Sequence, residues 1–259
     1  MKTMKKVVCF LFLALLLTAG AAHVWAEEEL PPKLHKLTDE AYHYYSSRET
    51  DKYFTTVKAV ENATEFSDYQ ETYYRACSYE AIYMFEYVDR KEGVALAHAI
   101  YHHAKENNSN VGMYFATFTL GTIREQSGNN ELAEKSYLQA LELKEKYLPD
   151  ESAAPCYLGL CEIALRKKDY DAVQENARKA LDEPKVIPMN QITAWSYKCL
   201  ARYNLRDSLG FEEAYRERDT LMKKFGGQGG LFGELLAVEE FVGNAEPSDD
   251  LTKMCIKMK

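Results

Sequence analysis

Apolar and small residues recur along the chain at intervals of three and four positions, the spacing of one face of an α-helix. Residues 120–141 show this pattern clearly: a Leu-Gly pair is followed by a turn at Gly128, and then by Ala133, Tyr137 and Ala140 on one helical face. Small residues let two helices approach closely, and large residues fill the grooves around them. The pattern therefore predicts two antiparallel helices joined at Gly128.

The same pattern returns at a fixed interval. Residues 160–181 repeat it 40 positions later, with Leu160 and Cys161 in place of the Leu-Gly pair, and a further step of 40 reaches Leu200 and Ala201. One helix pair cannot bury its apolar face alone, whereas a stack of pairs can. We therefore expect a periodic array of helix pairs.

Weaker copies extend this array in both directions. Residues 79–106 and 38–63 each read as two amphipathic helices, and one further pair is expected at 230–258, after the GGQGG segment. We predict about six pairs between residues 37 and 258. The last predicted helix leaves apolar residues uncovered, so either a partner covers them or the array continues in a longer protein.

The repeated segment resembles the tetratricopeptide repeat (TPR), in which a Leu-Gly pair, a turn glycine, an alanine, an aromatic residue and Ala-Leu follow one another. The clearest copies span about 114–147 and 154–184, and the motif weakens after Leu205, where Glu213 and Thr220 hold alanine positions. The usual period is about 34 residues, so a period of 40 implies a longer second helix. The resemblance implies an all-α, right-handed TPR-like solenoid of about six antiparallel helix pairs.

The first 26 residues have the features of an export signal. Three lysines precede an uncharged apolar run at 7–22, and Val24 and Ala26 stand before three glutamates. The run is shorter than the roughly 20 residues that cross a membrane, so we predict a signal peptide at 1–26, cleaved after Ala26. An uncleaved membrane anchor is the alternative. We expect a periplasmic protein of a Gram-negative bacterium, with an acidic, proline-containing lead-in at 27–36 and no stable membrane insertion after cleavage.

Composition narrows the choice of fold and partner. The chain is 46% apolar and 28% charged, which is typical of a folded protein, and its 13 glycines and 7 prolines are few for a turn-rich β fold. The net charge is −8, and loss of the three signal lysines leaves 29 basic against 40 acidic residues, a net charge of −11. Nucleic-acid-binding proteins concentrate basic residues, so we expect no nucleic-acid partner.

The TPR resemblance also implies a concave face lined by the first helix of each pair. Mapped onto this sequence, the residues of that face are Tyr79, Glu86, Phe118, Glu125, Glu162, Trp195, Lys198 and Arg202. The face is acidic early, basic late and aromatic between, which suits an extended peptide of mixed charge. Alternatively, the 19 tyrosines pack between helices and the acidic residues only solvate a surface. We predict a non-catalytic scaffold that binds a protein or peptide on this face.

A looser resemblance concerns the arrangement of the whole chain. The signal peptide, the acidic opening, the tyrosine-rich first pair ending in SSRETDKYF and the long helix pairs are similar to periplasmic TPR sensor segments of bacterial two-component histidine kinases. In that family the repeats precede a membrane helix and a kinase. The resemblance implies a second hypothesis, a sensor-type module whose partner is a membrane sensor kinase. It implies no kinase activity for this chain.

A metal-dependent enzyme is the third hypothesis. His98 and His102 stand one helical turn apart, and two such histidines can share a transition metal. No HExxH motif or assignable third ligand accompanies them, and no P-loop, G-x-G-x-x-G or G-x-S-x-G motif occurs. We therefore predict no catalytic residue, no metal site and no cofactor.

The cysteines leave two interpretations open. Cys156, Cys161 and Cys199 lie in or beside the repeated positions, where small buried thiols would fit the helix crossings. Because export permits disulfides, a Cys161–Cys199 or Cys156–Cys199 bridge between repeats is the alternative. No C-x-x-C motif is present to support thioredoxin-like redox chemistry.

Overall fold

The computed structural model describes residues 30–47, 49–65 and 67–225. These ranges contain helices and no strand. The helices are α3 (Pro32–Ser47), α4 (Thr50–Thr64), α5 (Gln70–Tyr83), the π-helical η2 (Met84–Val88), α6 (Arg90–Glu106), α7 (Asn110–Gln126), α8 (Asn130–Tyr147), α9 (Ala154–Arg166), α10 (Tyr170–Asp182), α11 (Pro188–Asn204) and α12 (Ser208–Phe225). The predicted signal peptide and the predicted last pair at 230–258 lie outside the described residues. None of the described helices has the length and apolar character that a membrane crossing needs.

The described residues fall into two compact units, with the boundary inside α9, after Gly159. The N-terminal unit contains α3 to α8 and the first part of α9, and the C-terminal unit contains the rest of α9 and α10 to α12. The prediction of an all-helical chain is confirmed for the described ranges. The right-handed solenoid of about six pairs stays a prediction.

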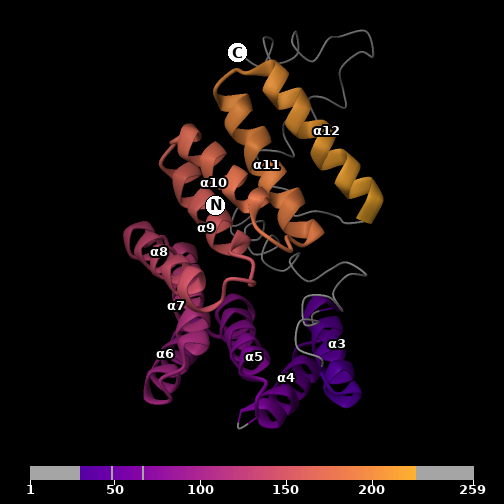
Figure 1. Ribbon diagram of the computed structural model, residues 1–259, viewed down its shortest axis with the longest axis vertical. Coiled ribbons are helices and arrows are strands. Elements are labelled where there is room, and N and C mark those ends of the chain that lie inside the picture. The colour runs from indigo at the N-terminus through magenta and orange to yellow at the C-terminus, as the bar shows by residue number, and fades with distance from the viewer. Residues whose placement is uncertain (1–29, 48, 66, 226–259) are drawn as a thin grey trace. The chain divides into compact units, whose positions relative to one another are not determined.

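Neighbouring helices of the N-terminal unit pack against one another in sequence order, from α3 against α4 to α7 against α8 (Figure 1). One further contact skips a helix, because α5 also packs against α7. Two helical hairpins, α5–α6 and α7–α8, are therefore stacked through their first helices. In the C-terminal unit α11 packs against both α10 and α12.

The α7–α8 hairpin is the pair predicted at 120–141. Ala133, Tyr137 and Ala140 of α8 are fully buried. A Cβ atom built on Gly121 would lie 3.0 Å from two ring carbons of Tyr137, so the small residue permits the close approach of α7 to the tyrosine ring. The crossing thus combines one small and one large residue, as the sequence pattern predicts.

Four of the turns between helices share one backbone geometry. One residue adopts a positive φ, and the next residue donates its N–H to the carbonyl five positions earlier over 2.9 Å, which closes the preceding helix. The side chain of that next residue then accepts a hydrogen bond from the N–H three positions later and caps the following helix. The positive-φ residues are Asn108, Gly128, Lys168 and Arg206, and the caps that follow them are Ser109, Asn129, Asp169 and Asp207.

Candidate functional site

In the N-terminal unit the predicted concave-face residues divide into two classes. Tyr79 and Glu86 are partly exposed. Burial raises the pKa of the Tyr79 hydroxyl, while the Arg75 guanidinium opposes that rise. Gln126 of α7 donates its side-chain N–H to Glu86 Oε1 over 2.6 Å, which ties η2 to α7. These side chains combine an aromatic ring with an anchored carboxylate.

Phe118 and Glu125, both on α7, lie in the interior and do not present their side chains to solvent. Phe118 is 7% exposed and its ring centroid lies 6.3 Å from that of Tyr137. Glu125 has no exposed surface. The expectation that both line an open surface is not met here, because α7 packs against α5, α6 and α8 and has few positions left for solvent.

In the C-terminal unit the predicted residues again divide by burial. Glu162 is 7% exposed and accepts hydrogen bonds from the Tyr197 hydroxyl and from Arg166 Nε, each over 3.0 Å. Its carboxylate thus serves packing between α9 and α11. Trp195, Lys198 and Arg202 occupy spacings of three and four residues on α11 and are each partly exposed.

The three α11 residues form a strip that we call the α11 strip. Lys198 Nζ lies 4.1 Å from the centroid of the Trp195 ring, within range of a cation–π interaction. Burial lowers the pKa of the Lys198 ammonium, although the nearby carboxylate of Glu213 raises it. Arg202 forms an ion pair with Asp207. The strip therefore offers one aromatic face and one ammonium to an anionic or aromatic group.

The candidate metal and thiol residues lie as follows. His98 and His102 are exposed on α6. Within the described ranges no group of three or more His, Cys, Asp or Glu residues is placed to hold a metal. Cys156, Cys161 and Cys199 are buried thiols, and Cys161 Sγ donates to the Val173 carbonyl over 3.5 Å. The structure thus agrees with the interpretation of buried thiols, and neither of the two alternative disulfides is formed in it.

Sequence reasoning missed a buried ion pair cluster in the N-terminal unit. Arg75 of α5, whose side chain is 8% exposed, pairs with Glu71 one turn earlier and with Glu151 in the loop after α8, where Nη2 and Oε2 are 3.1 Å apart. Its guanidinium carbon lies 5.3 Å from the Phe115 ring centroid. In the sequence, Glu71 and Arg75 stand four residues apart, as an ordinary ion pair on a helix surface does. Nothing in the local pattern indicates that Glu151 lies beside them.

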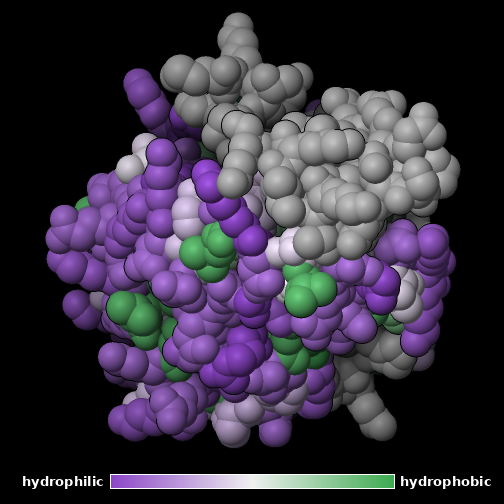
Figure 2. Space-filling view, turned by 90° about the horizontal axis from the view of Figure 1, so that it is seen from above, coloured by the Kyte–Doolittle hydropathy of each residue, from purple (hydrophilic) through white to green (hydrophobic). Residues whose placement is uncertain are grey.

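On the face drawn in Figure 2, the described residues are largely hydrophilic, with separate apolar residues between the polar ones. The large exposed apolar side chains of the described ranges are Val88, Leu132, Leu138, Tyr147, Leu205 and Leu209. Comparison of the chain with protein-family models, with curated proteins and with solved structures gives no match.

Proposed function

We propose that the chain is an exported, non-catalytic helical scaffold of TPR type that binds a protein or peptide partner. The observation that carries this proposal is the stacking of the α5–α6 and α7–α8 hairpins through the contact of α5 with α7. Stacked hairpins expose the outer sides of their helices as long surfaces, which suit an extended partner better than a small molecule. The repeated turn geometry supports the same assignment.

The α11 strip is the surface to which we assign the partner in the C-terminal unit. Trp195 provides a large, rigid contact area with little loss of conformational entropy. Lys198 supplies a positive charge beside it, at 4.1 Å from the ring centroid. A peptide segment with an acidic residue next to an apolar one would pair with the ammonium and cover the indole face. In the N-terminal unit, Tyr79 and Glu86 are the corresponding partly exposed candidates.

A crosslinking pull-down with the chain from Glu27 onwards tests the proposal in the periplasm of the native host. We expect one dominant protein partner, and we expect its recovery to fall when both Trp195 and Lys198 are changed to alanine. The matched control is Lys223→Ala on α12, which removes the same charge from a side chain that is 76% exposed and paired with Asp219. Equal recovery with all variants would contradict the assignment of the α11 strip.

The same experiment separates the scaffold from the sensor hypothesis. Recovery of a membrane sensor kinase as the dominant partner would support a sensor-type module. Recovery of a soluble periplasmic protein would support the scaffold. N-terminal sequencing of the periplasmic form tests export independently, since we expect the mature chain to begin at Glu27. A chain that begins at Met1 in the membrane fraction would support the uncleaved anchor instead.

A further inference from the structure

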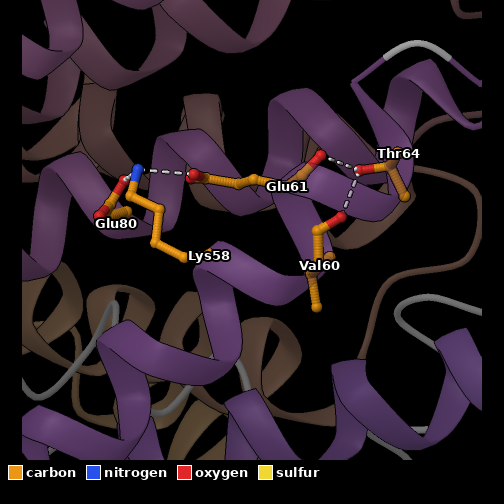
Figure 3. A network of polar contacts seen from close by, with 5 residues as sticks. All are labelled: Lys58, Val60, Glu61, Thr64 and Glu80. Atoms are coloured by element: carbon orange, nitrogen blue, oxygen red, sulfur yellow. Dashed lines mark hydrogen bonds and ion pairs between the residues drawn. The ribbon is translucent and has the colours of Figure 1, made fainter.

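Two buried carboxylates share one lysine at the packing surface between α4 and α5 (Figure 3). Lys58 Nζ lies 2.6 Å from Glu61 Oε2 and 2.8 Å from Glu80 Oε2. The Glu61 and Glu80 side chains are only 8% and 6% exposed, whereas Lys58 is 52% exposed. One positive charge thus faces two negative charges, and the excess negative charge lies in the interior, where ionised groups are poorly solvated.

The surroundings of the pair offer little further stabilisation of that charge. Oxygen Oε1 of Glu61 and the hydroxyl of Tyr53, also on α4, are buried and have no hydrogen-bond partner within the described ranges. Three further titratable groups face the carboxylates. The Tyr53 hydroxyl and the Cys77 thiol of α5 interact with both Glu61 and Glu80, and the Tyr73 hydroxyl of α5 interacts with Glu61. Burial is the first cause that raises the pKa of each of the three. The neighbourhood is therefore acidic or neutral apart from Lys58.

The turn of α4 that carries Glu61 is hydrogen-bonded to Thr64. The Thr64 hydroxyl bonds to the carbonyl of Val60 over 2.7 Å and to that of Glu61 over 3.3 Å (Figure 3). These bonds lie within the last turns of α4. The two carboxylates meet because Glu61 belongs to α4 and Glu80 to α5, and these two helices pack against each other with Lys58 between the carboxylates. A change of charge at the pair therefore acts on the contact between the two helices.

We propose that Lys58, Glu61 and Glu80 form a proton-sensitive contact, in which one proton taken from solvent by the carboxylate pair holds α4 against α5 and loss of that proton loosens them. With the proton bound, one ammonium faces one carboxylate and the cluster is neutral. The proton resides on Glu80, whose carboxyl lies within side-chain hydrogen-bonding reach of Glu61. Without the proton the cluster carries one uncompensated negative charge. This inference is independent of the proposed partner.

The direction of the pH effect follows from the pKa of Glu80. Burial, followed by the charge of Glu61, raises this pKa from 4.5 to about 7, although Lys58 opposes the rise. The folded chain therefore binds this proton more tightly than the unfolded chain. The stabilisation is complete below the ordinary pKa of 4.5 and is lost as the pH rises through about 7. We expect the contact between α4 and α5 to open more often at pH 8 than at pH 6.

Carbon NMR of the glutamate side chains of the full mature chain measures the titration directly. We expect the Glu80 carboxyl to titrate near pH 7, and we expect Glu61→Gln to lower that value because it removes the neighbouring negative charge. Lys58→Met should raise it. A Glu80 carboxyl that titrates between pH 4 and 5 in the wild-type chain would overturn the proposal. This decisive measurement uses the wild-type chain alone, so it does not depend on whether the variants fold.

Amide hydrogen exchange tests whether the proton controls the contact. Wild type and Glu80→Gln are compared at the same pH, so that the intrinsic exchange rates cancel. At pH 8 we expect α4 amides to exchange about threefold or more faster in the wild type, and at pH 6 we expect equal rates. The control is Glu131→Gln, which alters an exposed pair with Lys135. A wild-type to Glu80→Gln ratio that is the same at both pH values would refute the switch.

Discussion

Replacement of Gly93 by alanine should destabilise the N-terminal unit through one close contact. Gly93 is buried in the first turns of α6 and faces η2. A Cβ atom at this position would lie 2.4 Å from the backbone nitrogen of Phe85 and 2.5 Å from its Cβ. Carbon atoms at rest stay about 3.5–4.0 Å apart, so α6 and η2 would have to separate by on the order of 1 Å.

The size of this destabilisation follows from two opposing contributions, the cost of overpacking and the gain in helix propensity. Overpacking typically costs about 1–3 kcal/mol and more where backbone has to move, and here the clash is with backbone. Alanine is favoured over glycine in a helix by about 1 kcal/mol. We therefore expect Gly93→Ala to lower the free energy of unfolding by about 2 kcal/mol.

Gly121→Ala is the matched control. It is the same substitution in a buried helical position, with the same gain in helix propensity. Its Cβ would meet ring carbons of Tyr137 at 3.0 Å and Cβ of Ser136 at 3.3 Å, which are side-chain atoms that need to shift by only a few tenths of an ångström. The two terms then nearly cancel, and we expect a change within about 0.5 kcal/mol of zero.

Urea denaturation of the chain from Glu27 onwards, followed by far-UV circular dichroism, measures both variants. Because the described residues form two units, the transition of the N-terminal unit is identified by hydrogen exchange in α6. Equal destabilisation by the two substitutions, or a larger effect of Gly121→Ala, would refute the argument that the backbone contact at Phe85 decides the result.

Three further substitutions test other parts of the fold. Arg75→Met should lower the free energy of unfolding by about 3 kcal/mol at pH 7, since it leaves the carboxylates of Glu71 and Glu151 without their cation. Because burial raises the pKa of Glu151, this loss should be smaller when denaturation is repeated near pH 4. A loss that is the same at both pH values would contradict the assignment of a buried ion pair between Arg75 and Glu151. Asp89→Ala should cost about 1 kcal/mol, because Asp89 Oδ1 accepts hydrogen bonds from the N–H groups of Lys91 and Glu92 in the first turn of α6. Asp89→Asn should retain most of the stability in the same denaturation assay. Gly128→Ala should cost about 1 kcal/mol, because φ is 81° there although no atom obstructs a Cβ, and thermal melting should show this loss.

The sequence pattern predicted the helices and their crossings better than it predicted surfaces. Ala133, Tyr137 and Ala140 follow helical spacing and are buried, as expected. Phe118 and Glu125 were assigned to an open face from the TPR resemblance, yet α7 is covered on several sides and buries both. Helical periodicity shows which face of a helix is apolar, but the number of neighbours that a helix acquires depends on contacts distant in sequence.

The ion clusters could not have been predicted for the same reason. Lys58 and Glu61 stand three residues apart, which is ordinary on a solvated helix, and only the approach of α5 brings Glu80 to the same ammonium and buries both carboxylates. The local sequence shows which residues are charged, but it does not show how exposed their side chains are in the folded chain. Since the pKa of a carboxyl depends on burial as well as on its neighbours, a proton-sensitive contact is visible only after the helices are packed.

The recurring turn shows what is actually repeated along this chain. Among these four turns, glycine stands at the positive-φ position only at Gly128, where φ is 81°. Asn108, Lys168 and Arg206 adopt φ of 51°, 59° and 58°, despite the strain of a positive φ for a residue with a Cβ. The turns nevertheless share the 2.9 Å closing hydrogen bond and a Ser, Asn or Asp cap. The cap and the closing bond are therefore common to these four turns, whereas glycine is not. A search for this turn by its glycine would therefore miss turns that a search for the Ser, Asn or Asp cap detects. Because the cap and the closing hydrogen bond involve only residues of the turn and the adjoining helix ends, they place no requirement on the side chains of the outer helix faces, which can differ from pair to pair.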